Sequence, residues 1–295
     1  MSKGITFSVT SSVLFAVLYY YSTLLVPLSG EEIFGWRTLL TFPFLTIFIW
    51  SGGRQIMVKM LAQRMLQNPG LLLGAIATSA FLGVQLWLFM WAPLHGRALN
   101  VSLGYFLLPL TMLMTGRIVY KERLSRLQNL AALCAAFGVA NELYQVGSFS
   151  WETLTVALGY PVYFVLRRRL GSNNIGGLWF DMAFLLPAGL WFVYAGNLDI
   201  ATLNNHSLLY LLIPLLGVIS TFALIFYMMA SQILSLSLFG LLGYVEPVLL
   251  VVVALLLGES IKGAEWLTYI PIWIAVLLLI VEGVKTVYTR HNLDT

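Results

Sequence analysis

The sequence predicts an all-α integral membrane protein with ten transmembrane helices, arranged as two inverted repeats of five helices each. Composition, the number of long apolar segments and a weak internal repeat support this fold class. Of the 295 residues, 60% are hydrophobic and only 9% are charged, whereas a soluble domain usually carries about 25% charged residues. The polar groups that would cover a soluble surface are missing. This excludes a cytosolic globular enzyme, a disordered chain and a fibrous protein.

A helix needs about 20 mainly apolar residues to cross a bilayer. Ten segments meet this requirement, at residues 4–26, 32–51, 70–92, 98–120, 126–146, 151–169, 175–196, 207–230, 233–257 and 264–286. We interpret the first as a true span, because no small-residue cleavage site follows it. The connections are short, and the longest, from Ser51 to Pro69, is expected to form an interfacial helix. No soluble domain is expected.

The basic residues indicate the orientation of these spans. Most Lys and Arg residues fall in alternate connections or at the termini: Lys3, Arg54, Lys59, Arg64, Lys121, Arg123, Arg126, Arg167, Arg168, Arg169, Lys285 and Arg290. Only Arg97 and Lys262 fall on the opposite side, while Arg37 and Arg117 lie within spans. Because cytoplasmic loops carry an excess of Lys and Arg, we expect both termini to be cytoplasmic.

The internal repeat relates the two halves of the chain. Residues 87–109 align without gaps on residues 225–247, and each segment ends on a Gly-Tyr pair followed shortly by proline. We therefore expect one five-helix repeat over residues 1–147 and a second over residues 148–295. Since five is odd, the second repeat would enter the membrane from the opposite side. Inverted repeats of this kind are typical of secondary transporters.

Three stretches of the sequence resemble a known family. They are WRTLLTFPF at residues 36–44, QLWLFMWAPLHGRALNVSLGYFLLP at 85–109 and LLGYVEPVLLVVVALLLGE at 241–259. The chain resembles the EamA branch of the drug/metabolite transporter superfamily, most closely the RarD-type proteins, over nearly its whole length. The resemblance implies ten helices, a bacterial inner-membrane location and export of small molecules.

Charged residues inside the spans are the first candidates for function. A carboxylate such as Glu246, near the middle of its predicted span, costs about 2.5–3.5 kcal/mol to insert. It would carry protons or bind substrate, or alternatively bond the backbone beside Pro247. Arg37 and Asp181 lie at related positions in their repeats. Each would attract a charged group of the substrate or form one gate of the transport cycle. Alternatively, each would snorkel to the interface or pair with another helix.

Uncharged polar and aromatic residues are the second set of candidates for substrate binding: Tyr105, Tyr244, Tyr163, Trp87 and Gln85. A cavity lined by such groups suits a neutral, aromatic or amphipathic substrate. The alternative for each is simple packing.

Glycine and proline residues near the span centres are candidate hinges: Pro109, Pro247, Gly104 and Gly243. An internal proline removes a backbone donor and tends to kink its helix. Such kinks allow a transporter to rock, or alternatively only shape the bundle.

Several motifs are absent from the sequence. It has no Walker-type phosphate loop, no histidine pair at metal-ligand spacing and no G-x-S-x-G motif. We therefore predict no cofactor, no bound metal and no enzymatic activity.

The prediction is a secondary active transporter that exports small organic metabolites or drug-like compounds by alternating access. The alternative is a passive channel or facilitator. Proton coupling through Glu246 and uncoupled flux both remain open. The expected partners are a small-molecule substrate, protons if transport is coupled, and the lipid bilayer, with no nucleic acid. The protein is expected to be a monomer or a weak homodimer.

Overall fold

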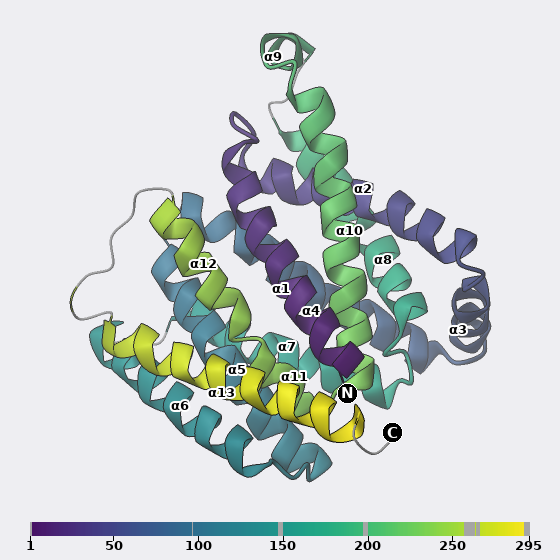
Figure 1. The fold of residues 1–295 in the computed structure, drawn as a ribbon. Coiled ribbons are helices and arrows are strands. Elements are labelled where there is room, and N and C mark those ends of the chain that lie inside the picture. The colour runs from purple at the N-terminus through teal and green to yellow at the C-terminus, as the bar shows by residue number, and fades with distance from the viewer. Residues whose placement is uncertain are drawn as a thin grey trace. The chain divides into compact units, whose positions relative to one another are not determined.

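The computed structural model describes residues 2–95, 97–146, 150–196, 200–256, 263 and 266–291. Within these ranges all regular secondary structure is helical (Figure 1). The helices, in chain order, are α1 (Ser2–Thr23), α2 (Gly30–Ser51), α3 (Gln55–Gln67), α4 (Pro69–Leu94), α5 (Ala98–Tyr120), α6 (Arg126–Val146), α7 (Trp151–Arg169), α8 (Ile175–Ala195), α9 (Ile200–Asn205), α10 (Leu209–Ile233), α11 (Leu236–Leu242), α12 (Val245–Leu256) and α13 (Trp266–His291).

Six helices in the described ranges are long and apolar enough to cross a membrane, as judged by length and composition. These stretches are Lys3–Thr23, Gly30–Ser51, Pro69–Ala92, Asn100–Tyr120, Ile175–Ala195 and Leu209–Ile233. The all-helical membrane fold is therefore confirmed. The other predicted spans coincide with α6, α7, the α11–α12 pair and α13, so the full count of ten remains a prediction. The connection expected to hold an interfacial helix does form one helix, α3.

The predicted span over residues 233–257 is wrong as one continuous helix, because α11 ends at Leu242 and α12 begins at Val245. Pro247 favours the break. In an unbroken helix Pro247 could not donate to the carbonyl of Gly243. In the structure Pro247 falls in the first turn of α12, where a missing N–H costs no intrahelical bond. The Gly243 carbonyl accepts instead from the backbone N–H of Glu246, at 3.2 Å. By contrast, α5 continues through Pro109.

The chain forms two compact units. The first unit comprises Met1–Ala16, Leu99–Pro161 and Met229–Thr295, and the second comprises Val17–Ala98 and Val162–Met228. In the first unit α6 packs along α13, which also contacts α11 and α12. In the second unit α8 packs against α2, α4 and α3. The predicted repeat boundary, between residues 147 and 148, lies outside the described residues.

Glycine allows α2 and α8 to approach closely in the second unit. A Cβ atom at Gly35 would lie 2.9 Å from the carbonyl oxygen of Gly189. A Cβ atom at Gly189 would lie 3.3 Å from the Cβ of Thr38. Such small residues are typical of membrane helix interfaces, where they bring backbones into contact.

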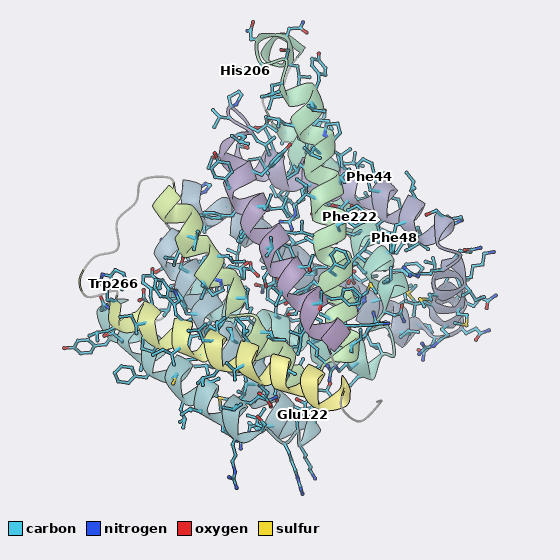
Figure 2. All side chains as sticks on the ribbon, in the orientation of Figure 1. Phe44, Phe48, Glu122, His206, Phe222 and Trp266 are labelled. Atoms are coloured by element: carbon cyan, nitrogen blue, oxygen red, sulfur yellow. The ribbon has the colours of Figure 1, made fainter. Side chains whose placement is uncertain are left out.

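Aromatic side chains connect α10 to α2 in the same unit. The rings of Phe48 and Phe222 meet edge to face, with centroids 6.5 Å apart (Figure 2). The ring of Phe44 lies 3.1 Å from where a Cβ atom at Gly217 would stand. The core of the second unit is therefore built from close helix contacts and interlocking rings, and these helices carry several of the predicted site residues.

Polar side chains join α6 and α13 in the first unit. Asn141 donates to Thr268 Oγ1 at 2.9 Å, and Thr268 donates to Glu142 Oε2 at 2.9 Å. Further along the same pair, Gln128 Nε2 donates to Glu282 Oε1 at 3.2 Å. Both carboxylates therefore have structural partners on the facing helix.

Candidate functional site

A buried ion pair lies in the second unit between α7 and α8. Asp181 and Arg167 are each 1% exposed, with Asp181 Oδ2 3.0 Å from Arg167 Nη1. The Tyr163 hydroxyl donates to the same carboxylate oxygen at 2.8 Å. The other oxygen, Oδ1, faces the hydroxyls of Thr78 and Ser79 on α4, at 3.2 and 3.1 Å. Two helices, α4 and α7, therefore direct donors onto the one carboxylate of α8.

The two hydroxyls on α4 have a second acceptor. Thr78 and Ser79 each lie 2.8 Å from the backbone carbonyl of Ala75. A hydroxyl carries a single hydrogen. Donation to Asp181 therefore competes with donation to Ala75. The hydrogen bonds to Oδ1 are for this reason easier to break than those to Oδ2.

The Arg167 guanidinium has further neighbours within the second unit. Nη2 donates to the carbonyl of Asn174 at 3.0 Å and to Met228 Sδ at 3.7 Å. Its Cζ lies 5.5 Å from the ring centroid of Tyr163. A Cβ atom at Gly177 would stand 2.5 Å from Nη1, so glycine leaves the room that the guanidinium occupies. Among the described residues, Nε has no hydrogen-bond partner.

Local sequence explains how these groups converge. Tyr163 and Arg167 are four residues apart on α7 and therefore share one helix face. Asn174 caps α8 by accepting from the Gly177 N–H at 3.0 Å, which fixes the connection whose carbonyl meets Arg167. Chemically, the cluster is a buried charge pair that can separate, or exchange a proton, only if the helices around it move.

The structure brings together two predicted site residues, Asp181 and Tyr163, and adds a third that sequence reasoning missed. The sequence pattern predicts Arg167 only as a cytoplasmic charge that sets orientation, yet it is fully buried. Its four-residue spacing from Tyr163 was the available signal in the sequence, and the structure adds Gly177, which lies against the guanidinium.

Arg37 forms a separate buried site in the second unit. It is 2% exposed on α2, and its Nε donates to Ser220 Oγ of α10 at 2.7 Å. The snorkelling alternative is therefore wrong for Arg37. Among the residues that the structure describes, the partners of Asp181 lie on α4 and α7, and Arg37 is not one of them.

Gln85 and Trp87 also lie in the second unit, on α4. Gln85 is 1% exposed. Trp87 is partly buried and packs against Trp91, with ring centroids 5.1 Å apart. Trp91 in turn stacks on His95 at 4.4 Å. These three rings stack at four-residue spacing along the end of α4 and onto His95, the residue that follows it.

The remaining candidate side chains lie in the first unit. Tyr244 is fully buried in the break between α11 and α12, and its hydroxyl donates to the Phe106 carbonyl at 3.1 Å. Tyr105 and Glu246 are partly buried. Glu246 stands in the first turn of α12 rather than in the middle of a continuous span, which corrects its predicted position.

The predicted hinge residues of the first unit have different surroundings. A Cβ atom at Gly104 would lie 2.6 Å from Val156 Cβ, so this glycine permits close packing of α5 on α7. The Pro109 carbonyl lies 3.2 Å from a Cβ placed at Gly240, and its ring 3.7 Å from one placed at Gly243. Pro109 therefore packs against α11 and the start of the helix break, whereas Pro247 lies in the first turn of α12.

Comparison with known proteins shows which family the chain belongs to. Residues 2–141 match the EamA-like transporter family. An uncharacterized transporter of Pasteurella multocida is 42% identical over 99% of this chain and 100% of its own length. The chain belongs to the EamA-like transporter family. This EamA-like protein is therefore a multi-pass membrane transporter with bacterial relatives, and not an enzyme.

Two further comparisons extend the likeness. The chloramphenicol-sensitive protein RarD of Pseudomonas aeruginosa is 42% identical over 94% of the EamA-like chain and 93% of its own length. A protein crystal structure superposes with a TM-score of 0.67 at 15% identity, covering 97% of this chain and 99% of that one. At this level of identity the second likeness concerns the fold alone.

Proposed function

We propose that this transporter exports small organic metabolites or drug-like compounds across the bacterial inner membrane by alternating access. The observation that carries the proposal is the fully buried Asp181–Arg167 pair. Buried ion pairs stabilise a fold poorly compared with apolar side chains, and charges inside a membrane usually mark a substrate or ion pathway. The pair would separate and re-form as the helices move through the cycle.

Alternating access by two inverted repeats is supported by the helix pairing within each unit. In the first unit α6 packs along α13, which correspond to predicted spans five and ten. In the second unit α2 packs along α8, which correspond to spans two and seven. Each pair thus joins equivalent members of residues 1–147 and 148–295. Equivalent helices packed on one another are what a pseudo-twofold axis between inverted repeats produces.

The interrupted helix supplies the proposed hinge. Transporters often bind substrate or ions beside discontinuous helices near the membrane midplane. The α11–α12 break contains Gly243 and Tyr244, and Pro247 follows it in the first turn of α12. This arrangement supports bending between the two short helices and brings Glu246 close to the hinge.

The proposed orientation has both termini in the cytoplasm, because most basic connections then lie on the cytoplasmic side. The protein would act as a monomer or weak homodimer. Substrate would be neutral, aromatic or amphipathic. Chloramphenicol is a reasonable first probe, because the name of the Pseudomonas aeruginosa relative connects that protein with the drug.

Exchange across a membrane tests the proposal directly. Purified protein is reconstituted into liposomes that are loaded with unlabelled chloramphenicol, and labelled drug is added outside. The liposomes should accumulate labelled drug transiently above its equilibrium level, since a carrier exchanges substrate through one site. Empty liposomes control for leakage. A passive channel would equilibrate the label without any overshoot. If no overshoot appears with chloramphenicol or with a panel of exported metabolites, the carrier assignment is wrong.

Proton coupling is tested at Glu246. Under an imposed pH gradient, Glu246→Gln should lose gradient-driven accumulation while retaining counterflow, because glutamine cannot take up and release a proton. Glu31→Gln is the matched control, a glutamate at the start of α2 that is expected to behave as wild type. Equal accumulation by wild type and Glu246→Gln would favour uncoupled flux or another proton carrier.

A further inference from the structure

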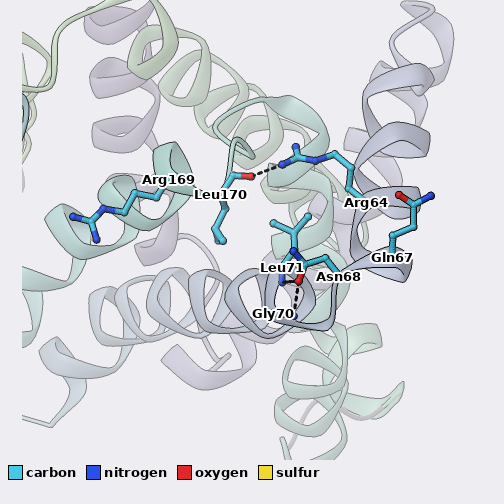
Figure 3. Close-up of a pocket in the computed structure, with 7 residues that line it drawn as sticks. All are labelled: Arg64, Gln67, Asn68, Gly70, Leu71, Arg169 and Leu170. Atoms are coloured by element: carbon cyan, nitrogen blue, oxygen red, sulfur yellow. Dashed lines mark hydrogen bonds between the residues drawn. The ribbon is translucent and has the colours of Figure 1, made fainter.

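A pocket opens on the surface of the second unit where α3 ends, α4 begins and the α7–α8 connection passes. Its volume is about 470 Å³. The lining residues are Arg64, Gln67, Asn68, Gly70, Leu71, Arg169 and Leu170 (Figure 3). The lining therefore contains two guanidinium groups and two side-chain amides, and no acidic residue. This composition favours an anionic ligand.

Arg64 is held in position on one side of the pocket. Its Nη2 donates to the carbonyl of Leu170 at 3.0 Å and its Nη1 to that of Gly171 at 3.3 Å. Gly171 has φ of +62°, and a Cβ there would lie 3.4 Å from both terminal nitrogens. Glycine thus makes the turn and the close approach possible together. Because a guanidinium carries five N–H donors, donors remain for a ligand.

The beginning of α4 contributes polar groups to the same pocket. Asn68 Oδ1 accepts from the backbone N–H groups of Gly70 and Leu71, at 2.9 and 3.3 Å. This orientation leaves the Nδ2 group of Asn68 as a donor. The positive end of the α4 dipole adds a favourable field for an anion.

Arg169 stands apart from Arg64 across the pocket, and Figure 3 shows Leu170 between them. Among the described residues, the Arg169 side chain has no hydrogen-bond or ion-pair partner. Its exposed side chain can therefore turn toward a bound anion without breaking an existing contact.

The neighbouring surface identifies the source of that anion. Helix α3 buries Val58, Leu61 and Met65, and Leu61 and Met65 belong to an apolar cluster with Leu71 and Ala75. Its outer surface nevertheless exposes Ile56 by 55%, Met60 by 52% and Leu66 by 87%. Exposed apolar side chains on a helix that also carries Lys and Arg are typical of a helix lying in the membrane interface.

We propose that this pocket binds the phosphate group of an anionic phospholipid, with Arg64, Arg169 and Asn68 as the donors. Basic pockets between membrane helices are suited to anionic headgroups. The exposed apolar side chains of α3 would lie among the acyl chains of the same lipid leaflet. The bound lipid would contact both α3 and the connection between α7 and α8, and would stabilise their packing.

The proposal is tested by measuring binding of phosphatidylglycerol and phosphatidylcholine to the full-length purified protein by native mass spectrometry. We expect saturable binding of phosphatidylglycerol and no comparable binding of phosphatidylcholine. Arg169→Gln and Arg64→Gln should each weaken phosphatidylglycerol binding about fivefold. Arg169→Gln removes no hydrogen bond within the described part of the chain, so its fold should be intact even if Arg64→Gln unfolds.

Lys59→Gln is the matched control, because it removes the same charge from α3 outside the pocket lining. It should bind phosphatidylglycerol as wild type does. An equal loss in all three variants would mean a diffuse charge effect and would overturn the site. Inorganic phosphate distinguishes the source: if millimolar phosphate binds and phosphatidylglycerol does not, the pocket takes free phosphate and the lipid assignment is wrong.

Discussion

Replacing Asp181 with asparagine is expected to lower the free energy of unfolding by about 3–5 kcal/mol, because it leaves the Arg167 charge buried without its counter-ion. Both side chains are 1% exposed, so water cannot take over the lost interaction. The measurement is thermal unfolding of the purified protein in one detergent, with transport assayed in parallel. We expect export to fall together with stability.

Two further variants separate the charge from the hydrogen bonds. Adding Arg167→Gln to Asp181→Asn should recover part of the lost stability, because the double variant no longer buries an unpaired charge. Tyr163→Phe removes one neutral hydrogen bond to Asp181 and should cost only about 1 kcal/mol. If the double variant recovers full stability but not transport, the charge pair is required for the cycle itself. An Asp181→Asn protein as stable as wild type would contradict the proposed energetic role.

Replacing Glu122 with alanine is expected to destabilise the first unit by about 2–4 kcal/mol, through loss of two charge-assisted hydrogen bonds. Its carboxylate accepts from the backbone N–H groups of Leu236 and Ser237, at 2.8 and 2.7 Å. These groups open α11, where N–H groups have no intrahelical partner. Removal of the carboxylate would free the α10–α11 connection and, in the proposed cycle, disturb the hinge that follows α11.

Limited proteolysis and thermal unfolding would measure this effect. Glu122→Gln keeps one acceptor oxygen and should lose about half as much stability as the alanine variant. Glu31→Ala is the control, because in the described part of the chain the Glu31 carboxylate has only a distant contact with His95, at 3.9 Å. A similar small loss in the Glu122 and Glu31 variants would show that the carboxylate does not hold α11.

Sequence reasoning located most helices of this protein, because length and apolar composition are local properties that one segment expresses on its own. It also selected Asp181 and Tyr163 as candidate site residues, since a polar group within an apolar segment stands out. It did not find the partner of Asp181. Arg167 lies at the end of α7 beside Arg168 and Arg169, and a run of three basic residues is typical of a cytoplasmic loop.

The break in the predicted span at residues 233–257 illustrates a second limit. Pro247 predicts a kink in this helix, as Pro109 does in α5. Yet α5 continues through its proline, while α11 and α12 separate at Gly243 and Tyr244. The buried Tyr244 hydroxyl, bonded to the Phe106 carbonyl, stabilises the separated form. That contact joins residues far apart in the chain, so it cannot be predicted from the sequence around Pro247.

By itself, the sequence determined that this chain is a helical membrane protein, where most of its helices lie and which family it resembles. The first two follow from the length and apolar composition of each segment, which must match the lipid around it. The family resemblance follows from matching stretches of sequence. Only the tertiary structure decided that Arg167 neutralises Asp181, that Glu122 holds the start of α11 and that Arg37 bonds Ser220. Such pairings depend on which helix faces come together, and that is set by close packing between segments distant in sequence.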